Sequence, residues 1–185
     1  MACAAHARPL RRHARSVCGR LSSVPNEPLA HFISFRTYGT WLHGDERGST
    51  DRRHNKRGEP FLPRDDFRRE FAARKQSGES VILGSAARAC VDTSIRATCA
   101  NREWQLLALN VRTNHVHLVV SATVAPERVM DALKAWATRR LRAAGLAAAD
   151  ARIWSRHGST ERIWLQRELD AACEYVTNGQ DEKLA

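Results

Sequence analysis

The chain has 185 residues and a formal net charge of +10, and 26 of its 30 basic residues are arginines. Hydrophobic residues make up 43% of the sequence, which is enough for one folded domain with extensions. No apolar run is long enough to predict a transmembrane helix, and five scattered cysteines without a Cys-x-x-Cys pair support neither a disulfide framework nor a zinc ribbon. The positive balance favours a polyanionic partner, because fixed cations release counterions from phosphate backbones. The cysteine usage favours a reducing, intracellular compartment.

Composition divides the chain into parts. Residues 1–27 are basic and lack hydrophobic periodicity, as in a transit peptide, a disordered tail or a segment read from a start codon placed too far upstream; we favour the last two. Residues 28–180 are expected to form the functional domain, and residues 181–185 a tail. Within the domain, glycines and prolines interleaved with charges make residues 46–80 a solvated insertion, with a short helix at 64–75.

Hydrophobic periodicity predicts four strands and three further helices. In chain order these are a strand at 31–38, a helix at 84–100, strands at 104–111 and 114–120, a helix from 125 that ends at Gly145, a strand at 162–165 and a helix from 167 to about 178. Trp154 and Trp164 flank a predicted Ser-Arg-His-Gly-Ser turn before the last strand. The first six elements form a βαββαβ unit, which predicts an α+β, ferredoxin-like antiparallel sheet with two helices on one face.

The helix that starts near residue 125 has an apolar side and a basic side. Pro126 suits its first turn, where a missing N–H costs nothing. The predicted buried stripe is Val129, Leu133, Trp136 and Leu141, and the predicted basic side is Lys134, Arg139, Arg140 and Arg142. A solvated face is the default interpretation of such charges.

The strand at 114–120 carries a His-x-His pair. Side chains on a strand alternate between its faces, so His115 and His117 point to one side while the apolar residues that follow each of them point into a core. Two imidazoles on one open sheet face are half of a metal site. The simpler alternative is a solvated face that carries two histidines.

Two loop segments hold further polar candidates. Gly39 and Gly44 bracket a turn that brings His43 and Asp45 together, either for conformational reasons or beside a metal or DNA site. The segment between the tryptophans holds good phosphate donors, namely Arg156, His157, Ser159 and Thr160. The alternative for this second segment is that it only closes the core.

Tyr175 lies in the last predicted helix, whose apolar stripe is Leu169, Ala172, Cys173 and Val176. At 3.6 residues per turn, Tyr175 lies roughly 110–120° from the centre of that stripe. It is therefore not a core residue of its own helix. It is either a capping aromatic residue with its hydroxyl in water, which is commoner, or a nucleophile.

Together these features resemble the single-tyrosine HUH transposases of the IS200-like family, which includes the REP-associated tyrosine transposases. The segments that carry the resemblance are 35–45, 110–117, 134–135, 154–159 and 174–176. A His-hydrophobic-His strand followed about sixty residues later by a helix-borne tyrosine is far more specific than either motif alone. The resemblance implies that the histidines lie on the central strand and that an extra C-terminal helix carries the tyrosine.

The resemblance also implies metal-dependent cleavage and rejoining of single-stranded or hairpin DNA. His115 and His117 would hold one Mg²⁺ or Mn²⁺, and Tyr175 would form a covalent 5′-phosphotyrosine and leave a free 3′-OH. The third ligand would be Asn178 or Gln180, of which Asn178 is favoured because it lies about 60° from Tyr175 on a continuing helix.

Further roles follow from the same resemblance. His43, Asp45 and His157 are candidates to complete or shape the site, and the DNA-binding candidates are Arg36, Arg112, Lys134, Arg139, Arg156, Ser159 and Arg162. A bacterial cytoplasmic, nucleoid-associated location without membrane contact is expected, and a homodimer is an option.

Two other functions stay open at this point. The first is a catalytically silent or regulatory DNA-binding protein of transposase descent. The second is an unrelated metal-dependent hydrolase that uses His43, Asp45, His115 and His117 around zinc, whose activity would survive the loss of Tyr175.

Overall fold

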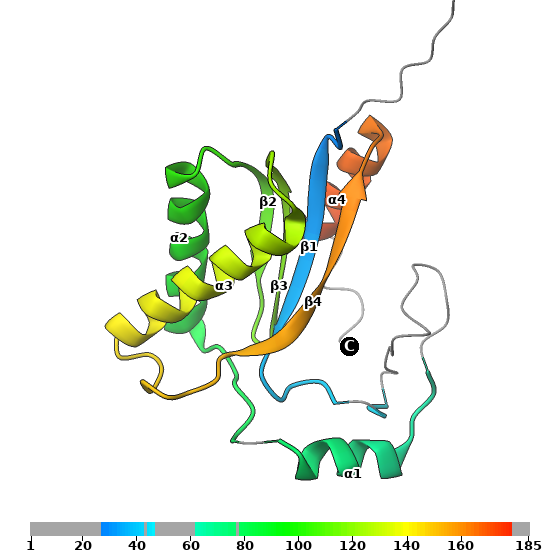
Figure 1. The fold of residues 1–185 in the computed structure, drawn as a ribbon, viewed down its shortest axis with the longest axis vertical. Coiled ribbons are helices and arrows are strands. Elements are labelled where there is room, and N and C mark those ends of the chain that lie inside the picture. The colour runs from blue at the N-terminus through cyan, green and yellow to red at the C-terminus, as the bar shows by residue number, and fades with distance from the viewer. Residues whose placement is uncertain (1–26, 43, 47–61, 77, 179–185) are drawn as a thin grey trace, which may run out of the picture.

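The computed structural model describes residues 27–42, 44–46, 62–76 and 78–178, which contain four strands and four helices (Figure 1). In chain order the elements are β1 (Ala30–Thr37), α1 (Asp66–Arg74), α2 (Ser85–Asn101), β2 (Gln105–Val111), β3 (His115–Ser121), α3 (Pro126–Ala143), β4 (Trp154–Ile163) and α4 (Gln166–Thr177). The expectations for residues 1–26, for residues 47–61 of the insertion and for the tail lie outside the described residues.

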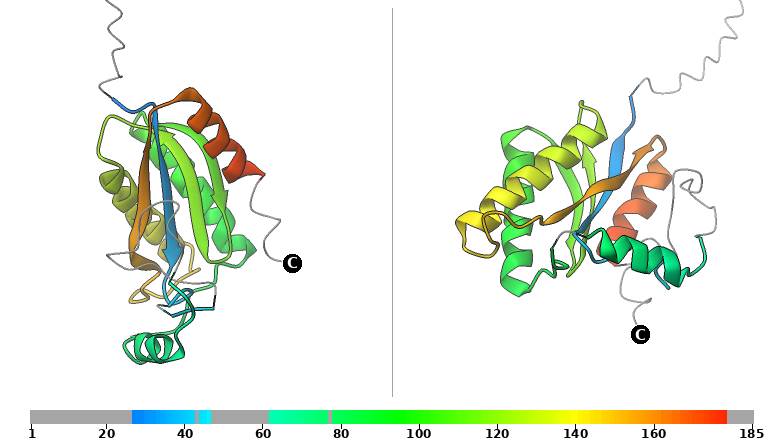
Figure 2. Two further views of the ribbon diagram at one scale, coloured as in Figure 1. Left: turned by 90° about the vertical axis from the view of Figure 1, so that its right-hand side faces the viewer. Right: turned by 60° about the horizontal axis from the view of Figure 1, so that its bottom comes forward.

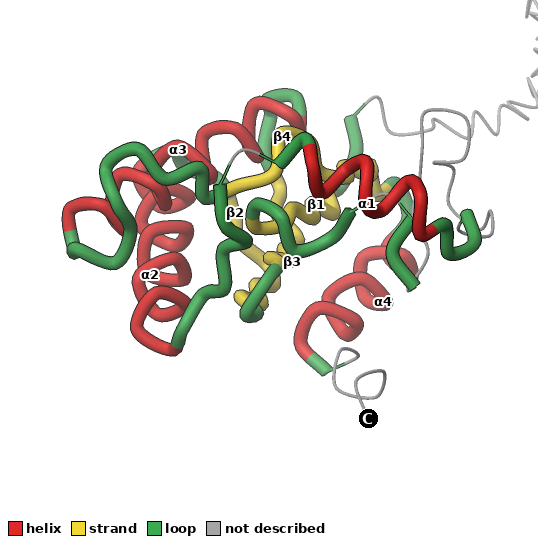
Figure 3. The backbone as a smooth tube through the Cα atoms, turned by 90° about the horizontal axis from the view of Figure 1, so that it is seen from below, coloured by secondary structure: helices red, strands yellow, loops and turns green. Residues whose placement is uncertain are grey.

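The four strands form one antiparallel sheet with the order β2-β3-β1-β4. With α2 and α3, these strands complete the βαββαβ unit, so the predicted ferredoxin-like α+β fold is confirmed. Figure 2 shows α2 and α3 on one face of the sheet and α4 on the other, with α1 beyond the end of the sheet where β1 stops. The tube in Figure 3 gives the same division, with α4 across the strands from α2.

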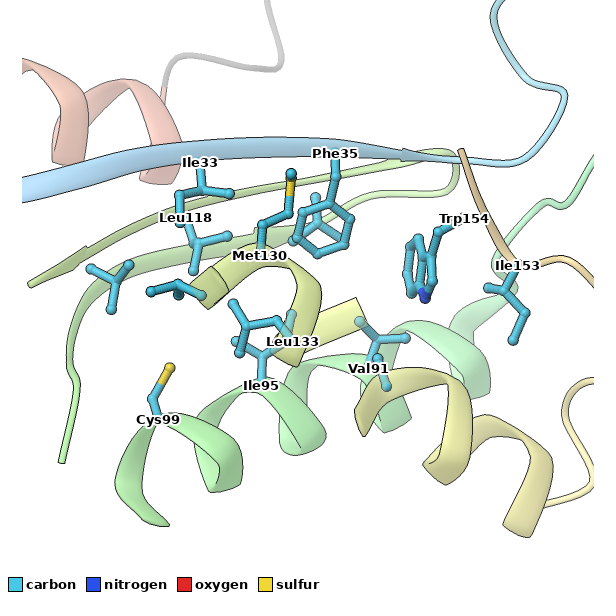
Figure 4. Packing of buried hydrophobic residues seen from close by; sticks show 14 of the residues in the cluster. Ile33, Phe35, Val91, Ile95, Cys99, Leu118, Met130, Leu133, Ile153 and Trp154 are labelled. Carbon is cyan, nitrogen blue, oxygen red and sulfur yellow. The ribbon is translucent and has the colours of Figure 1, made fainter. Parts of the chain in front are cut away.

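The main core lies between the sheet and the α2/α3 pair, as Figure 4 shows. Ile33 and Phe35 of β1 and Leu118 of β3 point into it, and all three are almost completely buried. Phe35 meets the indole of Trp154 edge to face, with ring centroids 5.1 Å apart. Alternation along β1 and β3 therefore commits one residue in two to this core, and the intervening residues to the opposite face.

A second, smaller cluster fixes α4 on that opposite face. Its buried members come from all four strands and from α4: Ala30, Ala108, Val119, Ile163 and Val176. The side-chain amide of Asn110 adds a polar tie, because its Nδ2 donates to the carbonyl of Val176 at 2.9 Å. The last helix is thus held against the face that carries the predicted histidine pair.

The prediction for the segment between the two tryptophans is wrong. Residues 154–163 form one continuous edge strand, with a register irregularity opposite Phe35–Thr37, rather than a turn followed by a short strand. The irregularity exposes two carbonyl groups toward α3, and Lys134 Nζ donates to both, at 3.1 Å to Ser155 and 3.3 Å to His157. The polar sequence is typical of a turn. It forms a strand here because Lys134, about twenty residues earlier on α3, supplies the hydrogen-bond donor for its carbonyls.

Two predictions about α3 are also wrong. Lys134 is buried (8% exposed) and Trp136 is 42% exposed, the reverse of the expected pattern. The buried stripe instead continues through Met130 and Ala137. The cause is that α3 packs against β4 as well as against α2, which rotates its buried side toward residues 130 and 134.

The expected short helix of the insertion is confirmed as α1. Asp65 caps it by accepting a hydrogen bond from the Arg68 backbone N–H at 3.0 Å. None of the described helices is long and apolar enough to cross a membrane.

Candidate active site

His115 and His117 lie on the same side of β3, an inner strand, with their ring centroids 4.7 Å apart. The strand register places Arg36 of β1 opposite His115, and Ser34 and Asn110 on either side of His117. The residue after each histidine, Val116 and Leu118, is completely buried in the main core. The core therefore fixes the direction in which both imidazoles project.

The tautomer of His115 follows from its hydrogen bond. Its Nδ1 lies 2.7 Å from Oδ1 of Asn114. An amide oxygen only accepts hydrogen bonds, so Nδ1 carries the proton and the lone pair remains on Nε2. A ring nitrogen left in this state, with its partner nitrogen held by a neighbour, is the usual condition of a metal-ligating histidine.

His117 is held in its neutral form. Burial, reinforced by the adjacent His115 and by Arg36, lowers the pKa of His117 from 6.5 to about 3. Its Nδ1 is buried without a hydrogen-bond partner among the described residues. A neutral imidazole with an uncompensated nitrogen beside a second histidine fits a site for a divalent cation.

Tyr175 approaches this pair from α4. Its ring meets His117 edge to face, with centroids 5.8 Å apart, and the side chain is 47% exposed. The neighbouring residue, Val176, is completely buried against the sheet. The periodicity argument that kept Tyr175 off the apolar stripe is thus confirmed, and the structure adds its proximity to the histidines.

Phe32 of β1 also belongs to this site, and the sequence analysis missed it. Its ring stacks on His117 (centroids 5.6 Å apart, interplanar angle 20°) and meets Tyr175 edge to face at 6.1 Å. The available signal was alternation: Ile33 and Phe35 enter the core, so Phe32 has to face the other way. Only the strand pairing shows that this side is where the histidines lie.

The third ligand remains a prediction. Asn178 caps the C-terminus of α4, one turn beyond Tyr175, and its backbone N–H donates to the carbonyl of Glu174 at 2.8 Å. Gln180 lies outside the described residues. No group of three or more histidine, cysteine or acidic side chains suited to a metal ion occurs in the described part of the chain.

The residues predicted to shape the site lie in different parts of the fold. Asp45 lines a small hollow beside α1 with Glu46, Arg64 and Arg69. His157 is exposed on β4, where its carbonyl accepts the hydrogen bond from Lys134. His43 lies outside the described residues. The structure therefore places Asp45 in a hollow lined by two acidic and two basic side chains at the α1 end, and its site-shaping role stays a prediction.

The predicted DNA-binding residues come from several different elements of the fold. Arg36 lies 3.3 Å from the ring centroid of Trp41, and Arg112 lies in the β2–β3 turn, where its backbone N–H donates to the His115 carbonyl. Arg139 is on the outer side of α3 beside Trp136, and the candidates on β4, namely Arg156, Ser159 and Arg162, are exposed. Lys134 is the exception. Burial lowers its pKa, and its ammonium group donates to two backbone carbonyls of β4, which favours a structural role.

These observations define a ferredoxin-like α+β domain in which a strand-borne histidine pair faces a helix-borne tyrosine. Comparison with protein-family models matches residues 74–178 to the family described as transposase IS200 like. The match covers more than half of the chain, and the chain therefore belongs to the IS200-like transposase family, as its resemblance predicted.

Comparison with individual proteins adds little beyond the family. No curated protein matches the chain. Among solved structures, it is similar to a REP-associated tyrosine transposase bound to a REP hairpin, at 11% identity and a TM-score of 0.47, covering 81% of this chain and 65% of that one. It is also similar to a candidate transposase of Deinococcus radiodurans R1, at 15% identity and a TM-score of 0.45, covering 82% and 90%. The chain thus spans less than two thirds of the first of these proteins.

Proposed function

We propose that this protein is a metal-dependent endonuclease and strand transferase that cleaves and rejoins single-stranded or hairpin DNA through a covalent 5′-phosphotyrosine. The observation that carries the proposal is the approach of the Tyr175 ring to His117, 5.8 Å between centroids, on the one sheet face that also carries His115. Membership of a transposase family and a net charge of +10 support DNA as the substrate.

The chemistry assigned to Tyr175 is nucleophilic. Its phenol oxygen attacks the scissile phosphorus, the bond from phosphorus to the 3′-oxygen breaks, and that oxygen leaves with a proton as a 3′-OH. The DNA 5′ end remains on the tyrosine as a phosphodiester. Attack of a 3′-OH on the same phosphorus reverses the step and releases the phenol, so rejoining needs no ATP.

His115 and His117 would hold the divalent cation, Mg²⁺ or Mn²⁺, with Asn178 or Gln180 as third ligand. Such an ion polarises a phosphoryl oxygen and neutralises the charge that develops in the transition state. Asn114 keeps His115 in the tautomer whose lone pair lies on Nε2, and the low pKa of His117 keeps that ring neutral and ready to bind. Arg36, opposite His115 in the sheet, adds positive charge where a phosphate would lie.

Two alternatives lead to different results. A regulatory protein of transposase descent binds DNA and forms no covalent product. An unrelated hydrolase is disfavoured by the family assignment, and it predicts cleavage that survives the loss of Tyr175.

The test is cleavage of labelled hairpin DNA with single-stranded flanks in Mg²⁺ or Mn²⁺, resolved on a denaturing protein gel. The proposal predicts a labelled protein–DNA adduct that Tyr175→Phe abolishes. Tyr38→Phe is the matched control, because Tyr38 is the only other tyrosine in the chain. Cleavage that continues unchanged in Tyr175→Phe, or binding without any adduct in the wild type, would refute the proposal.

A further inference from the structure

Three aromatic rings form a closed group on the face of the sheet that α4 covers. Phe32 stacks on His117 at 5.6 Å with an interplanar angle of 20°. It also meets Tyr175 at 6.1 Å and 64°, while Tyr175 meets His117 at 5.8 Å and 80°. Phe32 thus contacts both the histidine and the tyrosine without having reactive chemistry of its own.

The tyrosine side chain depends on these ring contacts for its orientation. Its backbone is fixed, because Val176 is completely buried and accepts a hydrogen bond from Asn110. Its side chain is 47% exposed, and its hydroxyl has no hydrogen bond within the described part of the chain. Packing against Phe32 and His117 therefore restricts rotation of the phenol ring.

The imidazole of His117 is restricted by the same residue. A stacked ring at 20° covers one face of the imidazole and resists rotation about the bond that joins it to the strand. No hydrogen bond holds its Nδ1 among the residues that the structure describes. Phe32 therefore supplies an orientation that a second hydrogen bond supplies for many ligating histidines.

We infer that Phe32 is a positioning residue that sets the distance and orientation between the Tyr175 nucleophile and the His117 ring. The inference rests on the proposed function for its catalytic consequence, and on the three ring contacts alone for its structural content. A flat ring is required for this role. Leucine fills a similar volume without a face on which an imidazole can stack, whereas tyrosine keeps the face.

The kinetic test compares Phe32→Leu with Phe32→Tyr in the full-length protein. In a single-turnover assay, we expect Phe32→Leu to form the covalent adduct about 10- to 100-fold more slowly, because small misplacements of reacting groups cost rate on this scale. We expect DNA affinity to change less than about twofold and Phe32→Tyr to keep at least a third of the wild-type rate. Phe32→Tyr combined with Tyr175→Phe should give no adduct, which shows that the introduced hydroxyl is not the nucleophile. A full rate in Phe32→Leu, or an equal loss in Phe32→Tyr, would overturn the inference.

The structural test needs no enzymatic activity. With only Tyr38 and Tyr175 in the chain, 3-fluorotyrosine labelling gives two ¹⁹F resonances that Tyr→Phe variants assign. We expect Phe32→Leu to move the Tyr175 resonance toward its value in the unfolded chain and leave Tyr38 in place. Phe32→Tyr adds a third resonance and should leave those of Tyr38 and Tyr175 nearly unchanged. An unmoved Tyr175 resonance in folded Phe32→Leu refutes the positioning role. If the wild type forms no adduct, the proposed function fails and this spectrum still decides the inference.

Discussion

Replacing Gly158 with alanine adds one methyl group where β4 lies between β1 and α3. A Cβ at this position would lie 2.5 Å from the Ser34 carbonyl oxygen, 2.5 Å from Met130 Sδ and 3.1 Å from Phe35 Cβ. Met130 Sδ belongs to a flexible side chain, but the Ser34 carbonyl belongs to an inner strand of the sheet. The methyl group therefore forces β4 away from β1.

The cost is that of overpacking a region that cannot relax. Extra methyl groups in packed cores typically cost 1–3 kcal/mol, and a clash with backbone places this site at the upper end, so we expect a loss of about 3 kcal/mol. Urea unfolding followed by circular dichroism measures the free energy of unfolding. Gly84→Ala is the matched control, because no atom lies within 4 Å of its added Cβ, and it should change stability by less than about 1 kcal/mol.

A second variant separates the two clashes. Met130→Ala is itself destabilising, but it removes one of the contacts, so the double variant should lose less stability than the sum of the two single losses. A Gly158→Ala protein as stable as the Gly84→Ala control would show that β4 is not seated against β1 in the register described.

Three further predictions concern the site and its support. The folded protein keeps His117 at a pKa of about 3, while the unfolded chain takes up a proton near 6.5. The free energy of unfolding of the metal-free protein should therefore decrease as the pH is lowered through this window. About 3 kcal/mol of the loss between pH 7.5 and about 4.5 should be absent in His117→Asn, and equal pH profiles of the two proteins would contradict the burial of His117. Lys134→Met should lower the free energy of unfolding by about 1–3 kcal/mol, because the carbonyls of Ser155 and His157 lose their donor. DNA affinity at a given salt concentration should not change, and a large loss of affinity in the folded variant would show that Lys134 contacts DNA. Asn110→Ala removes the tie to α4, so hydrogen exchange of α4 amides should speed up about fivefold, as a loss of about 1 kcal/mol implies, and unchanged exchange would mean that apolar packing alone holds the helix.

Much of the fold is predictable because periodicity reports burial directly. Alternation in β3 places Val116 and Leu118 in the core and the two histidines outside it, and the structure agrees. The stripe of α4 leaves Tyr175 exposed for the same reason. Where one apolar face determines how a strand or helix packs, the sequence alone predicts which of its residues are buried.

The errors occur where a residue's environment comes from a distant segment. Lysine is typically a surface residue. Lys134 is buried because two carbonyls at the register irregularity of β4 accept hydrogen bonds from its ammonium group. Tryptophan is typically a core residue, but Trp136 lies on the exposed side of α3. Phe32 joins the site because β1 pairs with β3, and strand pairing is not encoded in local periodicity.

The most direct test of the central claim is to identify the atom that carries the DNA. After reaction with hairpin DNA, nuclease and trypsin digestion should yield a modified peptide spanning residues 168–183, in which Tyr175 is the only tyrosine. We predict that fragmentation places a nucleotide on Tyr175 through its 5′-phosphate. A nucleotide joined through a 3′-phosphate, or one found on Tyr38 in the peptide spanning residues 37–47, would contradict the mechanism.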